Sequence, residues 1–209
     1  MLGLGRIRRA LSNRVSIYRL ARSVYRFAGG GSSISDGASI SYIGRYPLVC
    51  YLASKDDYLF SNFKHNRIYQ RILEHVTYEQ GKQYLGVINE YGTLTAEDWR
   101  EFVNNDLYGG PVTFTYNILG GTFKLSPTTI RYAKVLCDIL NLFDTGSIKS
   151  IAEIGIGYGG QCRLIRSKLP QAMYTLIDLP EVLGLAEKYL KHYDTCRENI
   201  RYVDGGHIY

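Results

Sequence analysis

The sequence predicts an α/β protein in which a mainly helical region is followed by a parallel sheet. From about residue 148 onward, short apolar runs alternate with helical segments, which is the pattern of parallel strands joined by crossover helices. Between residues 56 and 145, apolar side chains recur at the spacing of amphipathic helices. A glycine-rich loop over residues 155–160 directly follows the first predicted strand, so the sheet carries a candidate ligand site.

The composition is typical of a folded protein with a sizeable core. The chain has 209 residues, of which 45% are hydrophobic and 21% are charged. No apolar run reaches membrane-spanning length, and arginines interrupt the N-terminal segment, which argues against a secretory signal. We expect a cytoplasmic protein with four reduced thiols, because none of the cysteines forms a CxxC pair: Cys50, Cys137, Cys162 and Cys196.

The net charge of +6 is concentrated in residues 1–27. This segment contains no acidic residue and seven arginines: Arg6, Arg8, Arg9, Arg14, Arg19, Arg22 and Arg26. The rest of the chain is close to neutral, so the basic balance does not indicate nucleic-acid binding. Such an arm can lie on an anionic membrane, at the inner face of the plasma membrane, or it can pack on the protein or remain solvated.

Four regions follow from the changes in composition. Residues 1–28 are predicted to form a basic amphipathic helix, and residues 29–34 a flexible linker rich in glycine and serine. Residues 35–145 are expected to form a mainly helical substrate or cap region. Residues 146–209 contain the alternating pattern and are expected to form part of a Rossmann-like domain.

Capping signals divide the helical region. Residues 56–90 are mostly helical by their apolar spacing. Thr95 and Asp98 resemble a capping box at the start of the next helix, over residues 97–105. The segment 106–125 has turn glycines and alternating β-branched and aromatic residues, which fits either an extended loop or a short hairpin.

A longer helix begins after this segment. Ser126 is its predicted N-cap and Pro127 its first residue, and the helix is expected to end near residues 144–146. Three strands should follow, at residues 148–154, 173–177 and 200–203, and the first should be buried. Helices are expected between them, over residues 161–168 and 180–193.

The glycine loop and two acids form the candidate site. Gly155, Gly157 and Gly160 match the dinucleotide-binding fingerprint, with Asp178 at the position of an acid that binds ribose hydroxyls. Glu153 precedes the glycines, where a carboxylate could anchor an ammonium group. Taken alone, Glu153 could be a surface acid and Asp178 could cap the following helix, but their combination with the loop favours a nucleotide-type cofactor site.

Several motifs resemble the sugar O-methyltransferase family of bacterial polysaccharide loci. The resemblance covers about residues 100–209, and its motifs occur in order: Asn105–Pro111, Ser126–Tyr132, Glu153–Gln161 and Thr175–Pro180. Gly110 departs from the family, which more often has asparagine there. The resemblance implies methyl transfer from S-adenosyl-L-methionine to the hydroxyl group of a sugar or glycan acceptor, in the biosynthesis of a surface polysaccharide.

The resemblance also implies roles for individual residues. The methionine side of the cofactor would be lined by Glu153, Gly155, Gly157, Tyr158 and Gly159. Asp178 and Leu179 would hold the ribose and the edge of the adenine. Arg131 would approach the methionine carboxylate unless it is a solvated helix charge, and Asp204 could reach the adenine.

The resemblance further implies a sheet of seven strands, of which this sequence supplies three. We therefore expect either a fragment or truncated gene product with an open sheet edge, which we prefer, or a partner that covers this edge; we expect weak or no methyltransferase activity and assign no catalytic base. His207 is expected to be a satisfied or solvated histidine, and we see no cluster of divalent-metal ligands. The alternatives are an NAD-dependent enzyme that uses the same glycines, and a non-catalytic paralogue that binds a membrane or partner through its arginine-rich arm.

Overall fold

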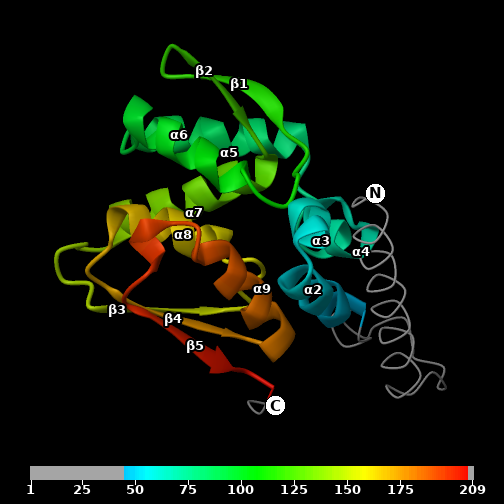
Figure 1. Cartoon of the computed structure of the whole chain (residues 1–209). Coiled ribbons are helices and arrows are strands. Elements are labelled where there is room, and N and C mark those ends of the chain that lie inside the picture. The colour runs from blue at the N-terminus through cyan, green and yellow to red at the C-terminus, as the bar shows by residue number, and fades with distance from the viewer. Residues whose placement is uncertain (1–44, 207–209) are drawn as a thin grey trace, which may run out of the picture. The chain divides into compact units, whose positions relative to one another are not determined.

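The computed structural model describes residues 45–206 (Figure 1). The chain divides into two units between Leu48 and Val49, and apart from the start of α2 at Arg45 the description below concerns the second unit. The predicted basic helix and linker, and His207, lie outside the described residues. Their structure and the proposed membrane contact therefore stay predictions.

Short helices form the first part of the described chain. Their bounds are α2 Arg45–Lys55, α3 Asp57–Asn62, η2 Phe63–His65, α4 Arg67–Ile72, α5 Tyr78–Tyr91, α6 Ala96–Phe102 and η3 Val103–Asp106. The predicted capping box at α6 is confirmed, since Asp98 accepts a hydrogen bond from the Thr95 backbone (2.8 Å) and Thr95 accepts one from the Asp98 backbone (3.3 Å). A second capping box, formed by Thr77 and Gln80, begins α5.

The segment whose structure the sequence left open is a hairpin. Strands β1 (Phe114–Ile118) and β2 (Gly121–Leu125) pair antiparallel through a turn at Leu119 and Gly120, which have φ angles of 48° and 76°. Helix α7 (Pro127–Leu142) follows at once. The Ser126 side chain accepts a hydrogen bond from the Thr129 backbone (3.1 Å), which confirms the predicted N-cap.

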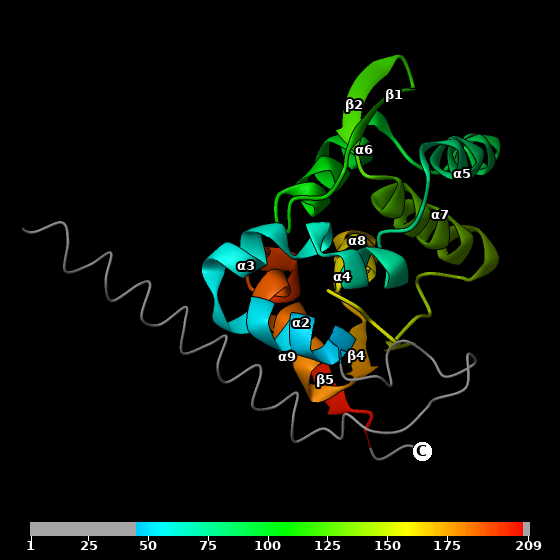
Figure 2. The ribbon, with the colours of Figure 1, turned by 90° about the vertical axis from the view of Figure 1, so that its right-hand side faces the viewer.

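The C-terminal part alternates strands and helices, which confirms the predicted α/β class. Its elements are β3 Ser150–Ile154, α8 Gly160–Lys168, β4 Met173–Asp178, α9 Pro180–Leu190, η4 Asp194–Cys196 and β5 Ile200–Asp204. The strands form a parallel sheet in the order β3-β4-β5. Helix α7 lies between α5 and α8, so the helical region packs on the sheet domain through α7 (Figures 1 and 2).

The prediction that the first strand is buried is wrong. Every residue of β3 is exposed or half-buried, and Ile154 keeps 74% of its surface exposed. Within residues 45–206, β3 pairs only with β4, so it forms one edge of the sheet. An apolar run predicts a strand, but whether that strand is covered depends on its neighbours.

Aromatic side chains supply many of the largest residues of the core, which explains part of the high tyrosine content. Tyr69, Tyr158, Tyr174 and Tyr189 are among the largest fully buried side chains, together with Trp99. The cysteines at 50, 137, 162 and 196 are buried free thiols. In the part of the chain that the structure describes, no helix has the length and apolar character needed to cross a membrane.

Candidate cofactor-binding site

The loop between β3 and α8 adopts a backbone conformation that needs glycine at three positions. Gly155, Gly157 and Gly159 have φ angles of 75°, 57° and 84°. The Gly155 N–H donates to the Ile177 carbonyl (3.0 Å), so the loop starts as an extension of the sheet. It then turns directly into α8.

The three glycines differ in what surrounds them. A Cβ atom at Gly157 would lie 2.5 Å from Cδ1 of Leu73, and one at Gly159 would lie 3.0 Å from Cδ1 of Leu190. At Gly155, by contrast, no protein atom lies within 4 Å of the Cβ position. A ligand can therefore approach the loop backbone closely at Gly155, while the other two glycines permit close packing within the protein.

Glu153 lies on β3, one residue before the strand ends, and it is more than a surface acid. Its carboxylate accepts a hydrogen bond from the Tyr174 hydroxyl (2.7 Å) and is half-buried. Burial raises the pKa of Glu153 to about 7; the hydrogen bond from Tyr174 opposes this rise, and the charge of Asp178 adds to it. A cationic group beside Glu153 would stabilise its ionised form.

Asp178 lies at the end of β4 and braces the glycine loop. One oxygen accepts a hydrogen bond from the Leu179 backbone (2.8 Å) and the other from the Gly157 backbone (3.4 Å). Burial raises the pKa of Asp178, and these backbone donors partly oppose the rise. The N-cap of α9 is Leu179, with no side-chain cap, so the interpretation of Asp178 as a helix cap is wrong.

The Tyr158 side chain points into the core. It is fully buried, packs edge-on against Tyr189 with ring centroids 4.8 Å apart, and accepts a hydrogen bond from Asn105 (3.2 Å). The Nζ atom of Lys64 lies 4.0 Å from its ring centroid. These contacts anchor the loop in the protein, so only the Tyr158 backbone is placed to line a cofactor.

A buried polar network lies on the core side of the glycine loop. Its central member is Lys64, which was not predicted from the sequence. Asp106 accepts hydrogen bonds from the backbone and hydroxyl of Ser126 (2.6 and 2.8 Å) and from the Thr129 hydroxyl (2.9 Å). The Lys64 Nζ atom lies 3.8 Å from Asp106 Oδ1 and 3.4 Å from the Asn105 carbonyl oxygen. Burial lowers the pKa of Lys64, which Asp106 opposes.

This network explains why two of the sequence motifs occur together. Asn105 and Asp106 belong to the first motif, and Ser126 and Thr129 belong to the second. The side chain of Asn105 donates both to Thr129 (3.0 Å) and to Tyr158 (3.2 Å), so it joins both motifs to the glycine loop. The motifs were visible in the sequence, but Lys64 carried no local signal.

Arg131 and Asp204 lie at the margin of the site. The Arg131 guanidinium carbon lies 5.2 Å from the Tyr132 ring centroid. The positive charge of Arg131 acts to lower the pKa of Glu74. Asp204 pairs in register with Asp178 across β4 and β5, but it is exposed and accepts a hydrogen bond from the Gly206 backbone (2.8 Å). These contacts bring neither side chain onto the glycine loop.

The arrangement has two carboxylates at the ends of adjacent parallel strands and an open glycine between them, which is the layout of the predicted nucleotide-type cofactor site. Residues 127–208 match the family model of the O-methyltransferase domain. This range contains the glycine loop, Glu153, Asp178 and the whole parallel sheet, and it supports a class I methyltransferase. No curated protein and no solved structure gave a significant match.

Proposed function

We propose that this protein is an O-methyltransferase that uses S-adenosyl-L-methionine and acts on a sugar hydroxyl in bacterial surface polysaccharide or glycan biosynthesis. The observation that carries the donor half of the proposal is the open face of Gly155 between Glu153 and Asp178. The family match over residues 127–208 favours a methyl donor over NAD. The sugar acceptor rests on the resemblance of four sequence motifs.

The residues present fit this cofactor. Glu153 would accept hydrogen bonds from the ammonium group, while Asp178 and the Leu179 backbone would hold the ribose and the adenine edge. Gly155 would admit the methionine part close to the backbone. When bound, the cofactor supplies an electrophilic methyl group to a hydroxyl oxygen, which loses its proton as the new C–O bond forms and the C–S bond breaks.

The contribution of this chain to the reaction is positioning. The hydrogen bond from Tyr174 holds Glu153 in one orientation, and the two backbone donors hold Asp178 against the loop. Methyl transfer is an in-line displacement, so a fixed orientation of donor and acceptor lowers the entropic part of the barrier. The buried network around Lys64 and Asp106 supports the glycine loop from its core side.

Calorimetric titration with S-adenosylhomocysteine and with NAD tests the donor site. We expect S-adenosylhomocysteine to bind more tightly, and Asp178→Asn to weaken its binding at least ten-fold, about 1.4 kcal/mol. Glu90→Gln, on the exposed face of α5, is the matched control and should bind like the wild type. Tighter binding of NAD than of S-adenosylhomocysteine would contradict the proposed function.

A further inference from the structure

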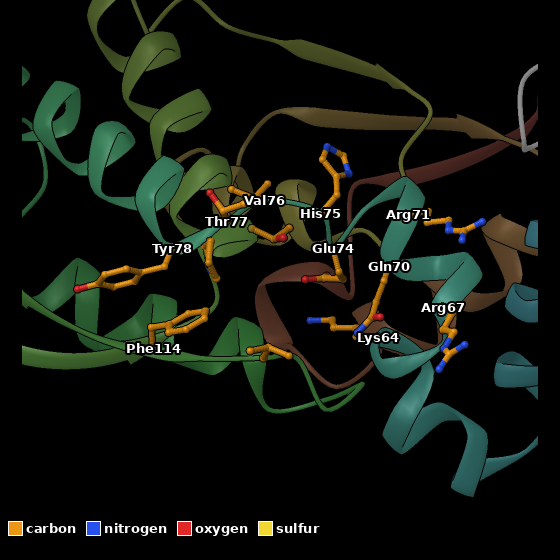
Figure 3. Close-up of a pocket in the computed structure, with 13 residues that line it drawn as sticks. Lys64, Arg67, Gln70, Arg71, Glu74, His75, Val76, Thr77, Tyr78 and Phe114 are labelled. Atoms are coloured by element: carbon orange, nitrogen blue, oxygen red, sulfur yellow. The ribbon is translucent and has the colours of Figure 1, made fainter. Parts of the chain in front are cut away.

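A pocket with a volume of about 580 Å³ lies among the helices that precede the glycine loop. It is lined by η2, α4, the segment between α4 and α5, the start of α5, β1 and the start of α7, and it is partly open to solvent (Figure 3). Polar side chains line one wall, among them Lys64, Gln70 and Glu74. Two aromatic rings, Tyr78 and Phe114, line the other.

The polar wall contains a carboxylate that the protein leaves partly unsatisfied. Figure 3 shows Glu74 and Lys64 projecting into the same space. Oε1 of Glu74 is buried and has no hydrogen-bond partner among residues 45–206. Burial raises the pKa of Glu74, which the charge of Lys64 and the Thr128 hydroxyl oppose. An unpaired buried carboxylate oxygen is costly, so a ligand with hydroxyl donors would stabilise it.

The aromatic wall is partly open to solvent. The ring centroids of Tyr78 and Phe114 are 5.1 Å apart at an angle of 41°, and Phe114 keeps 37% of its surface exposed. A sugar ring has an apolar C–H face that packs on such rings and hydroxyl groups that need polar partners. A pocket with aromatic side chains on one side and a few convergent polar groups on the other suits that shape.

The basic residues of the pocket do not make it an anion site. Figure 3 shows Arg67 and Arg71 at one edge, with their guanidinium groups directed away from Glu74 and Lys64. The centre therefore combines one acid and one base. Glu74 can accept a hydrogen bond from a hydroxyl, whereas it would repel a phosphate.

The pocket and the glycine loop share one short segment. The side chain of Leu73 covers Gly157, and the next residue, Glu74, faces the pocket. The Thr128 hydroxyl donates to the Leu73 carbonyl (3.3 Å), which ties this segment to the start of α7. Burial raises the pKa of Tyr132, and the charges of Glu74 and Glu153 add to this rise, so this tyrosine lies within electrostatic reach of both sites.

We propose that this pocket binds the acceptor as an uncharged, hydroxyl-rich sugar ring, an inference that rests on the proposed function. The apolar face of the ring packs on Phe114 and Tyr78. One hydroxyl donates to Oε1 of Glu74, whose charge the buried Lys64 balances. Leu73, which covers Gly157, then connects the wall of this pocket to the glycine loop.

Saturation-transfer NMR with the methyl α-glycosides of glucose, galactose, mannose and rhamnose tests the pocket in the full chain. We expect at least one glycoside to bind through its ring C–H protons. Phe114→Ala and Glu74→Gln should each weaken that binding at least five-fold. Two controls, Phe143→Ala and Glu90→Gln, replace an exposed phenylalanine and an exposed glutamate elsewhere and should bind like the wild type.

A parallel titration with S-adenosylhomocysteine separates the two proposals. If S-adenosylhomocysteine binds but none of the glycosides does, or if both pocket variants bind glycoside like the wild type, the acceptor pocket is wrong and the donor site stands. If a glycoside binds and the pocket variants lose it while S-adenosylhomocysteine does not bind, the pocket stands and the proposed methyl donor is wrong. Preferential binding of glucose 1-phosphate over every neutral glycoside would overturn the assignment to an uncharged ring.

Discussion

Replacement of Glu153 by glutamine should change how the stability of the protein depends on pH. The pKa of this carboxyl is raised from 4.5 to about 7, mainly because it is buried. Between these two values the folded state holds a proton that the unfolded state has lost. The free energy of unfolding of the wild type therefore falls as the pH rises through this window.

The size of the effect follows from the shift. A difference of one pKa unit corresponds to about 1.4 kcal/mol, so between pH 5 and pH 8 the wild type should lose about 2.5 kcal/mol through Glu153. Because the side chain is half-buried, this value is an upper bound. Glu153→Gln cannot titrate, and it keeps an oxygen that can accept from Tyr174, so this component of the loss should disappear.

Urea unfolding at pH 5 and pH 8 measures the effect directly. Asp178 also has a raised pKa, but it is present in both proteins and cancels in the comparison. Glu90→Gln should follow the wild type, because that residue is exposed. If Glu153→Gln and the wild type lose the same stability, within about 0.5 kcal/mol, between the two pH values, the assigned burial of Glu153 is wrong.

Three further predictions concern the same region. Gly155→Ala should cost about 1 kcal/mol of stability, since its φ of 75° is strained for alanine but no atom obstructs the Cβ, yet it should weaken S-adenosylhomocysteine at least ten-fold by calorimetry; binding unchanged would place the ligand elsewhere. Lys64→Met should destabilise the fold by about 3 kcal/mol in urea unfolding, because it leaves Asp106 buried without its cation; a loss below 1 kcal/mol would show that the ion pair contributes little. Tyr174→Phe should raise the pKa of Glu153 by about one unit through loss of a hydrogen bond, and shift the pH midpoint of S-adenosylhomocysteine binding upward; an unchanged midpoint would separate Glu153 from binding.

Local signals in the sequence determined much of the secondary structure. The cap at Ser126 and the box at Thr95 were predictable, because each depends on hydrogen bonds within one helical turn. The order of strands and helices after residue 148 was predictable from apolar periodicity. The choice between loop and hairpin at residues 106–125 was not, because strand pairing depends on contacts between separate segments.

The sequence predicted which residue types form the candidate site, but it did not predict the burial and contacts of these residues. The glycines of the loop were predictable because the turn from β3 into α8 requires positive φ angles at three of them. Which of them is open was not predictable, since Leu73 closes Gly157 from a segment more than eighty residues earlier in the chain. The role of Lys64 was not predictable for the same reason, because its partners Asn105 and Asp106 come from another helix.

By itself, then, the sequence determined where the strands, helices, caps and glycine loop lie, because these depend on backbone geometry and on neighbours within a few residues. Only the tertiary structure decided that β3 is an exposed edge, that Tyr158 is an anchor in the core, and that Glu153 has a pKa near 7. It also decided that Glu74 faces a pocket beside the loop. Burial and charge depend on segments far apart in the chain, and packing alone brings those segments together.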